Sequence, residues 1–325
     1  MKRKRRSIIL LLLTLTVSVS AADKQKIILD CDLGGDIDDA FAVALVLTSP
    51  EFEVLGLVMD HGNTPKRAQV ACRMLYETGM EHIPVVFGRH TPVIVGEQDE
   101  LAGDSNQFFW AKGFDKVKPI KQNAADFIIE NLNAYPGEVI LFTVGPLPNI
   151  QDVLQKDPKA LTLAKRVVSM FGSFYMGYGT GSPPVPEWNV RADIQAAQLF
   201  VQAGANITYA GLDITTFVKL NEEYRTRLWL RQSPLTNSLS GLYTLWRFEQ
   251  YARPDPTLFD VVAVGMVLWP ELFTTRDVHI TVDDKGYTRI DPDKAPNGQI
   301  GVTIQVDEFL NRVMERYLKQ NLMRQ

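Results

Sequence analysis

Short, nearly continuous apolar segments alternate with amphipathic ones along most of the chain. The apolar segments predict buried strands over residues 26–30, 53–59, 83–88, 138–144 and 205–213. The segments between them have helical periodicity and predict helices over residues 38–48, 65–79, 123–135, 147–156 and 192–203. This alternation predicts an α/β fold in which helices flank an open, mostly parallel, Rossmann-like sheet.

The last third of the chain has a different pattern. Helical periodicity covers residues 222–253 and 260–268, two strand-like runs follow at 278–284 and 299–306, and an amphipathic helix is expected over 307–321. No linker or repeat interrupts the sequence, so we expect one domain over residues 23–325. Residues 89–122 and 172–191 are long and irregular, and they are expected to border an active site at the carboxyl ends of the strands.

The first 22 residues have the three parts of a secretory signal peptide. Five cations at positions 2–6 precede an apolar stretch over 8–19, and small residues follow at 20–22. We therefore expect a protein that is exported, periplasmic or secreted, and has no stable membrane association after cleavage. The alternative is a short N-terminal membrane anchor.

Composition and charge narrow the function classes. The 325 residues are 46% hydrophobic and 22% charged, which is typical of a globular protein. Removing five cations and no acid from 34 Lys and Arg and 38 Asp and Glu changes the net charge from −4 to −9. An acidic chain without a basic stripe argues against nucleic acid as a partner. Cys31 and Cys72 lie in apolar contexts and are expected to be buried thiols.

An acidic cluster follows the first predicted strand. Asp30 ends the strand, and Asp32, Asp36, Asp38 and Asp39 come within the next nine residues. So many carboxylates at one strand end repel one another unless a cation neutralises them, and hard oxygen ligands suit Ca²⁺ or Mg²⁺. The alternative, an acidic helix start, explains only two of the five. Dinucleotide binding is disfavoured because phosphates prefer bare backbone amides to acids.

This segment resembles the DxDPGxDDA signature of the inosine–uridine-preferring nucleoside hydrolase family. Further resemblances follow in order at residues 61–63, 83–88, 143–149, 186–189 and 259–263, so the similarity spans about residues 26–322. The resemblance implies a Ca²⁺-dependent enzyme that hydrolyses the N-glycosidic bond of ribonucleosides to free base and ribose.

The resemblance also implies roles for individual residues around the ion. Asp32 would contact the metal and act as general base on a water molecule. Asp39 would be a bidentate ligand, Asp260 would complete the metal shell, and Val144 would contribute its main-chain carbonyl. Asp30 would be a supporting acid close to the ion.

A second set of residues is implied to bind the substrate. Asp38 would hold ribose hydroxyls, and Asn63, Glu187 and Asn189 match polar residues around the ribose. Carboxylates and amides are natural partners of hydroxyls. The alternatives are turn positions for the two asparagines, a solvated charge for Glu187 and a helix cap for Asp260.

Two departures from the family pattern bear on the chemistry. The spacing from Asp32 to Asp38 is two residues longer than in the usual motif, which marks a variant with a longer first Asp-rich motif and leaves Asp36 as an extra carboxylate. Phe259 stands where the base-nonspecific branch has a histidine acid for the leaving base. Only His61 is considered as a substitute acid, and a structural role is the alternative for it.

Purine-preferring relatives instead stack the base between aromatic rings, and this chain has rings in its irregular segments and in one predicted helix. Trp188 is the one assigned to substrate binding. The full set of candidate rings is Phe108, Phe109, Trp110, Tyr175, Tyr178, Trp188 and Trp246, for which core packing is the alternative.

Our sequence-based hypothesis is an N-ribohydrolase that acts on a small-molecule nucleoside, as a monomer or as the homo-oligomer common in the family. The first alternative is an exported nucleoside- or sugar-binding protein on the same scaffold with lost or weak catalysis. The second is a haloacid dehalogenase-type phosphohydrolase, which also opens with Asp-x-Asp but does not account for Asp38, Asp39, Glu187 and Asn189.

Overall fold

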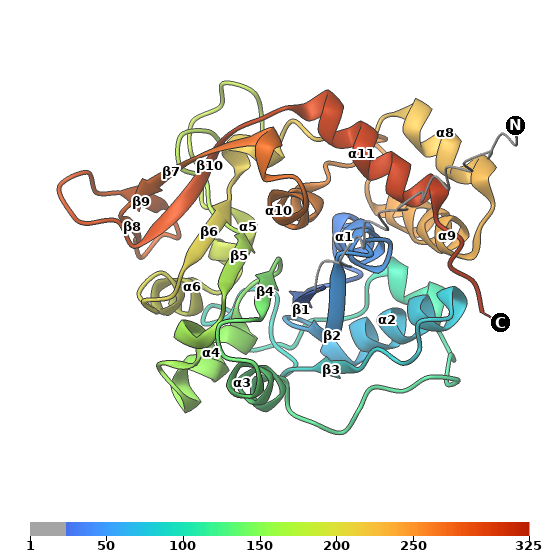
Figure 1. Ribbon diagram of the computed structural model, residues 1–325, viewed down its shortest axis with the longest axis horizontal. Coiled ribbons are helices and arrows are strands. Elements are labelled where there is room, and N and C mark those ends of the chain that lie inside the picture. Colours follow the sequence, from blue (N-terminus) through green and yellow to red (C-terminus); the bar gives the residue numbers. More distant parts are fainter. Residues whose placement is uncertain (1–23, 325) are drawn as a thin grey trace, which may run out of the picture.

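The computed structural model describes residues 24–324, and the predicted signal peptide over 1–22 lies outside them. An eight-stranded sheet in the order β3-β2-β1-β4-β5-β6-β10-β7 forms the centre (Figure 1). The strands are β1 (Gln25–Cys31), β2 (Phe52–Met59), β3 (Val85–Phe87), β4 (Ile140–Thr143), β5 (Arg166–Met170), β6 (Ile207–Ala210), β7 (Phe273–Val278), β8 (Ile280–Val282), β9 (Thr288–Ile290) and β10 (Gly298–Ile304).

The sheet is parallel except at one edge. Only β7 runs antiparallel, against β10, while β8 and β9 pair in a separate two-stranded hairpin. The predicted open, mostly parallel sheet is confirmed. The carboxyl ends of β1, β2 and β4 therefore lie together at one edge of the sheet.

Helices cover both faces of the sheet (Figure 1). They are α1 (Asp38–Leu47), α2 (Thr64–Thr78), α3 (Ala124–Ala134), α4 (Pro148–Lys156), α5 (Trp188–Ala192), α6 (Ile194–Phe200), α7 (Leu212–Thr215), α8 (Glu222–Arg231), α9 (Pro234–Glu249), α10 (Phe259–Leu268) and α11 (Val306–Lys319), with 3₁₀ turns at Asn106–Ala111, Ala160–Leu163 and Pro270–Leu272.

Each face of the sheet has its own apolar core. Ile27 and Leu29 of β1 point into the core shared with α1, α2, α9, α10 and α11, whereas Ile28 points into the core shared with α3, α4 and α6. Because both faces are covered, the central strands are apolar at nearly every position. Both cysteines are buried and free, as expected. No described helix has the length and apolar character needed to cross a membrane.

Two strands of the sheet are missing from the sequence prediction. β5 is five residues long, and its two polar members, Arg166 and Ser169, interrupt an apolar run that is already short. β7 lies at the sheet edge and exposes Thr274 to Asp277, so it has no apolar pattern to detect. The predicted strand over 278–284 is corrected to the end of β7 followed by β8, and β9 completes a hairpin that the pattern did not indicate.

The expected single helical stretch over 222–253 is two helices. Gln232 adopts a left-handed conformation with φ of 48°, which ends α8. Ser233 then caps α9 in a capping box with Thr236, and Pro234 occupies the first turn. The predicted strand over 205–213 is also shorter, because Gly211 ends β6 and begins α7. The region 172–191, expected to be irregular, includes the start of α5.

Candidate active site

Acidic side chains gather where β1, β2 and β4 end. Asp30 lies in β1 and Asp32 directly after it, while Asp38 and Asp39 begin α1. Asp260 is the second residue of α10, which packs against α1. We call the cavity between them the inner pocket. It has a volume of about 100 Å³ and is lined by Asp32, Asp36, Asp38, Asp39, Val144, Met170, Tyr178, Glu187, Trp188, Asn189, Phe259 and Asp260.

Three of these carboxylates are placed to hold a cation. Asp38, Asp39 and Asp260 are buried, and each has an oxygen within 4.8 Å of an oxygen of the other two. The Asp260 backbone N–H donates to Asp38 Oδ2 at 3.2 Å. Burial, followed by the repulsion from neighbouring carboxylates, raises the pKa of all three well above the usual range. A divalent cation with a preference for oxygen ligands fits this donor set.

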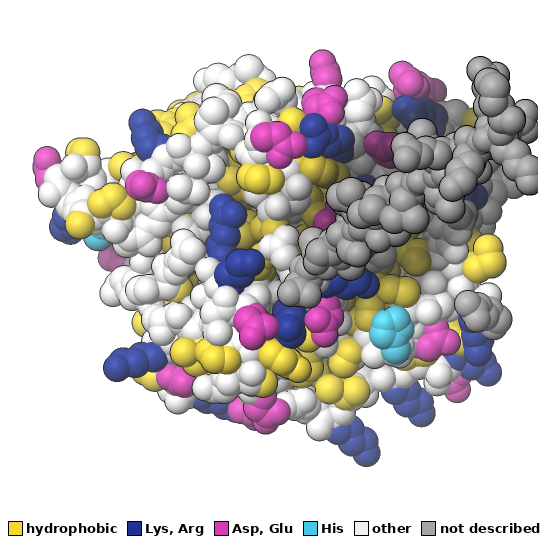
Figure 2. Space-filling model, in the orientation of Figure 1, with side chains coloured by type: hydrophobic (Ala, Val, Ile, Leu, Met, Phe, Trp, Pro, Cys, Tyr) yellow, Lys and Arg dark blue, Asp and Glu magenta, His cyan; other side chains and the backbone are white. Residues whose placement is uncertain are grey.

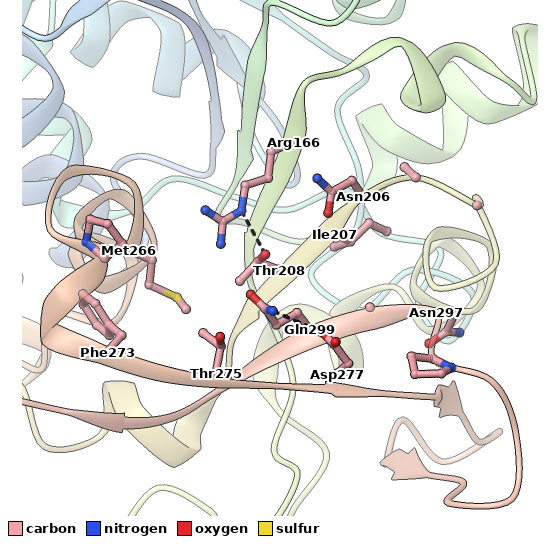
Figure 3. A pocket seen from close by; sticks show the side chains of 15 residues that line it. Arg166, Asn206, Ile207, Thr208, Met266, Phe273, Thr275, Asp277, Asn297 and Gln299 are labelled. Atoms are coloured by element: carbon pink, nitrogen blue, oxygen red, sulfur yellow. Dashed lines mark hydrogen bonds between the residues drawn. The ribbon is translucent and has the colours of Figure 1, made fainter.

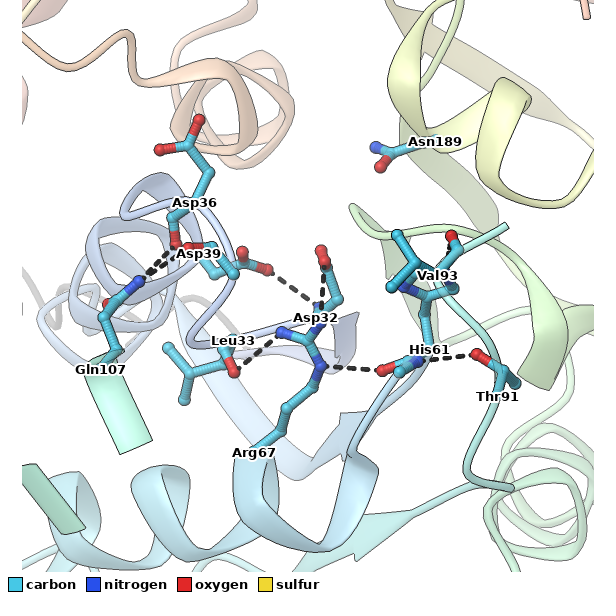
Figure 4. Close-up of polar contacts among 12 residues, drawn as sticks. Asp32, Leu33, Asp36, Asp39, His61, Arg67, Thr91, Val93, Gln107 and Asn189 are labelled. Atoms are coloured by element: carbon cyan, nitrogen blue, oxygen red, sulfur yellow. Dashed lines mark hydrogen bonds and ion pairs between the residues drawn. The ribbon is translucent and has the colours of Figure 1, made fainter. Parts of the chain in front are cut away.

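Asp32 lies beside this group and is paired with a cation of the protein. The Asp32 backbone N–H donates to Asp39 Oδ1 at 3.0 Å, and its carboxylate Oδ2 is 3.4 Å from Nη2 of Arg67 (Figure 4). Arg67 is itself held by the main-chain oxygens of Leu33 and His61. Because the guanidinium always carries its charge, Arg67 places a fixed positive charge beside the Asp32 carboxylate.

Behind Asp32 lies a buried acid pair that sequence reasoning found only in part. Asp30 accepts a hydrogen bond from Asn149 Nδ2 at 2.8 Å, and burial raises its pKa to about 7. Asp60 follows β2 and lies beside Asp30, fully buried, with a pKa that burial raises well above the usual range. Neither acid lines the inner pocket, so Asp30 lies behind the predicted metal position.

The sequence pattern could have identified Asp60, because Asp60 directly follows β2 in the same way that Asp32 directly follows β1. Arg67 was also missed, although it is a lone cation on the buried side of α2. A charged residue at such a position needs a partner, and this requirement is the signal that could have identified it.

The opposite wall of the inner pocket comes from β4 and α5. The Val144 carbonyl lies at the pocket and accepts a hydrogen bond from Asn189 Nδ2 at 2.7 Å. Glu187 caps α5 by accepting backbone N–H groups of Asn189 and Val190, and it also accepts that of Gly172. Its burial raises its pKa to about 7. The side chains of Glu187 and Asn189 therefore have fixed positions before any ligand binds.

Asn63 and His61 lie farther out. They line a separate cavity of about 400 Å³, the first chamber, which also borders Asp32, Arg67 and Trp188. Asn63 donates to Asp104 at 3.0 Å and so is committed to another partner. Trp188 is 43% exposed and lines both the inner pocket and the first chamber.

The geometry argues against His61 as the leaving-group acid. Its Nε2 is 3.0 Å from the Val93 carbonyl, which requires Nε2 to carry the proton (Figure 4). Burial lowers its pKa to about 4, so the ring is neutral near pH 7. His61 therefore has a structural hydrogen bond and no spare proton for a leaving base.

The candidate aromatic rings separate into three groups. Phe108, Tyr178, Trp188 and Trp246 line cavities at the site, although Phe108 is itself buried. Trp110 lies under Arg73. Phe109 and Tyr175 are more than half exposed and away from the inner pocket.

A larger groove, of about 790 Å³, lies at the amino ends of β5 and β6 (Figure 3). Its one cation, Arg166, donates to Thr208 at 3.0 Å, and its one carboxylate belongs to Asp277. This groove is larger than the inner pocket, but the chemically active groups are concentrated at the carboxyl edge of the sheet. Acidic and basic side chains are interspersed on the face seen in Figure 2.

A parallel α/β sheet with a carboxylate-rich pocket at its carboxyl edge defines an α/β enzyme with a site suited to a divalent cation. Residues 27–311 match the family model described as inosine-uridine preferring nucleoside hydrolase, and the chain belongs to this family of N-ribohydrolases. The family assignment from sequence is thereby confirmed.

Named relatives agree with this assignment. The chain is 29% identical to uridine nucleosidase 1 of Arabidopsis thaliana, covering 81% of this chain and 79% of the relative. It is 28% identical to the pyrimidine-specific ribonucleoside hydrolase RihB of Escherichia coli O1:K1, covering 90% and 97%. The structure of a plant nucleoside hydrolase, PpNRh1, superposes with a TM-score of 0.81 at 26% identity, covering 92% of this chain and all of that one.

Proposed function

We propose that this protein hydrolyses the N-glycosidic bond of ribonucleosides to free base and ribose in a Ca²⁺-dependent reaction. The observation that carries the proposal is the inner pocket itself, in which six acidic side chains and the Asn189 amide face a cavity of about 100 Å³. Ribose hydroxyls donate readily to carboxylates, and positive charge that develops at the anomeric carbon is stabilised by the same groups.

Each residue has a part in this reaction. Asp32, paired with Arg67, takes the proton of the attacking water. Asp39, Asp260 and the Val144 carbonyl would hold the cation, and Asp38, which lies beside them, and Asn189 hold the sugar hydroxyls. A bound Ca²⁺ would supply positive charge that orients the sugar and makes a nearby water more acidic.

The first experiment measures reducing-sugar release by the mature protein from purine, pyrimidine and nicotinamide ribosides, with and without a Ca²⁺ chelator. We expect release that the chelator abolishes and that Ca²⁺ restores better than Mg²⁺. Phosphate release from phosphate esters with Mg²⁺ would instead favour the phosphohydrolase alternative.

A substitution tests the role of the base. Asp32→Asn keeps the side-chain volume but removes the proton acceptor, so we expect a folded protein whose kcat falls by at least about 100-fold. The matched control is Asp99→Asn in an exposed loop, which is expected to retain wild-type turnover. Wild-type kcat in Asp32→Asn would overturn the mechanism.

The nucleoside-binding alternative is supported by Phe259, since a phenyl ring cannot protonate a leaving base. Tight ribose binding by calorimetry without turnover of any riboside would favour it. We further propose export, on the basis of the signal-like pattern over 1–22. Recovery of a chain that starts near residue 23 from the periplasm or the medium tests this proposal.

A further inference from the structure

The cavities at the site offer separate places for the two parts of a nucleoside, the sugar and the base. The inner pocket is small, and two larger cavities adjoin it: the first chamber of about 400 Å³ and a second chamber of about 520 Å³. Asp36 borders all three. The hydroxyl-rich sugar belongs among the carboxylates of the inner pocket, so the flat base must extend into one of the chambers.

The second chamber suits a heterocycle. Tyr178 and Phe259 line both it and the inner pocket, and their rings meet edge to face at 6.0 Å. Trp246 and Gln250, which stand between this chamber and the first, offer an aromatic surface and an amide to the edge of a base. In the first chamber the cation Arg67 is already engaged by Asp32 and by two main-chain oxygens.

The second chamber also contains two cations without a described partner. Lys219 and Arg253 line it, and neither forms an ion pair with any carboxylate among residues 24–324. The neighbouring Asp255 pairs with Arg225 instead. Asp36 is the remaining acid of the chamber, and the positive charge of Arg253 acts on it. An anion that enters this chamber therefore meets two cations, Lys219 and Arg253, against the single remaining carboxylate of Asp36.

The chemistry of the bond makes this charge useful. As the water oxygen bonds to the anomeric carbon, the bond from that carbon to the base nitrogen breaks and its electron pair stays on the base. The water proton goes to Asp32. Phe259 cannot protonate the base, and burial raises the pKa of Tyr178 further above neutrality. The base then leaves as an anion and takes its proton from solvent after release.

Building on the proposed function, we propose that the second chamber receives the leaving base and that Arg253 and Lys219 stabilise it as an anion. The favoured substrates are then ribonucleosides with an acidic oxo-base of the uracil type, and a base such as cytosine, which forms an anion much less readily, is disfavoured. Fixed positive charge placed where negative charge develops lowers the barrier without any proton transfer.

The test compares uridine with 5-fluorouridine, whose bases have nearly the same shape while fluorine makes the base a better anion. For Arg253→Gln and Lys219→Gln we expect kcat/KM for uridine to fall about tenfold or more. The loss for 5-fluorouridine is smaller, so the ratio between the two substrates widens. Lys219→Arg restores the ratio, because charge rather than a donated proton is required. The matched control is Arg227→Gln on the exposed surface of α8, which leaves the ratio unchanged.

Two outcomes would overturn the inference alone: a ratio unchanged in both glutamine variants, or faster hydrolysis of cytidine than of uridine by the wild type. Hydrolysis of the riboside of p-nitrophenol distinguishes a failure of this inference from a failure of the proposed function, because p-nitrophenolate departs readily as an anion. A wild-type protein that releases neither p-nitrophenol nor any base, with calcium bound, would overturn both.

Discussion

Gly145 shows how tightly single residues are constrained at the site. A Cβ added there would lie 2.5 Å from Asp60 Oδ1 and 2.9 Å from Asp32 Oδ1. Both oxygens belong to side chains that are held in place, Asp32 by Arg67 and Asp60 by complete burial. The absence of a side chain at position 145 therefore allows β4 to approach the two acids closely.

We expect Gly145→Ala to displace Asp32 and to reduce kcat strongly, with a loss of about 1–3 kcal/mol in the free energy of unfolding. Denaturant unfolding and nucleoside turnover measure the two effects. Gly103→Ala is the stability control, since a Cβ there meets nothing within 4 Å. Equal stability of the two variants would contradict the close approach.

At this scale the sequence predicted the acids that follow β1, because five carboxylates in ten residues are conspicuous. It could not predict which of them share the pocket. Asp30 points away toward Asp60 and Asn149, whereas Asp36 reaches the pocket edge. These directions depend on the turn between β1 and α1 and on contacts with residues far along the chain.

At the scale of elements, the junction of α8 and α9 separates two helices that local periodicity joins. Ser233 marks the start of α9. Its hydroxyl accepts a hydrogen bond from the Thr236 backbone N–H, and the Thr236 hydroxyl accepts one from the Ser233 backbone N–H. Gln320 from the C-terminal segment also donates to the Ser233 hydroxyl at 2.7 Å. The junction thus ties the end of the chain to α9.

Ser233→Ala removes the cap and leaves buried donors without an acceptor, so we expect the free energy of unfolding to fall by about 1 kcal/mol or somewhat more. Urea denaturation measures it. Ser240→Ala, later in the same helix, is the comparison, because no described group hydrogen-bonds with that hydroxyl. A loss no larger than in Ser240→Ala would show that the box does not stabilise the junction.

Elements buried on both faces were the easiest to predict, and edge elements the hardest. β1, β2 and β4 have continuous apolar runs because helices cover both sides of them. β7 and the β8–β9 hairpin are exposed, so pairing partners rather than composition determine their structure. The elements that carry the site were easier to predict, because the site lies on the central strands.

At the scale of the whole molecule, we expect the acidic site to link folding to pH and to the binding of the proposed Ca²⁺. Burial raises the pKa of Asp38, Asp39 and Asp260, and that of Glu187 to about 7, so the folded protein without metal binds more protons than the unfolded chain. Stability is greatest where these groups are protonated and is lost as the pH rises through their raised pKa values. His61 has the opposite effect, but only between about pH 4 and its ordinary pKa of 6.5.

Thermal unfolding at pH 6.5 and 8.5, in chelator and in saturating Ca²⁺, tests this linkage. In chelator we expect a lower Tm at pH 8.5, because Glu187, whose pKa burial raises to about 7, is then ionised and the other buried carboxylates are closer to losing their protons. Calcium binds only the ionised cluster, so it should raise the Tm more at pH 8.5, with about 2.7 kcal/mol of stabilisation at 100 times the Kd. Asp39→Asn should reduce both effects. Calcium stabilisation that is equal at the two pH values would show that the buried carboxylates are not the groups that bind the ion.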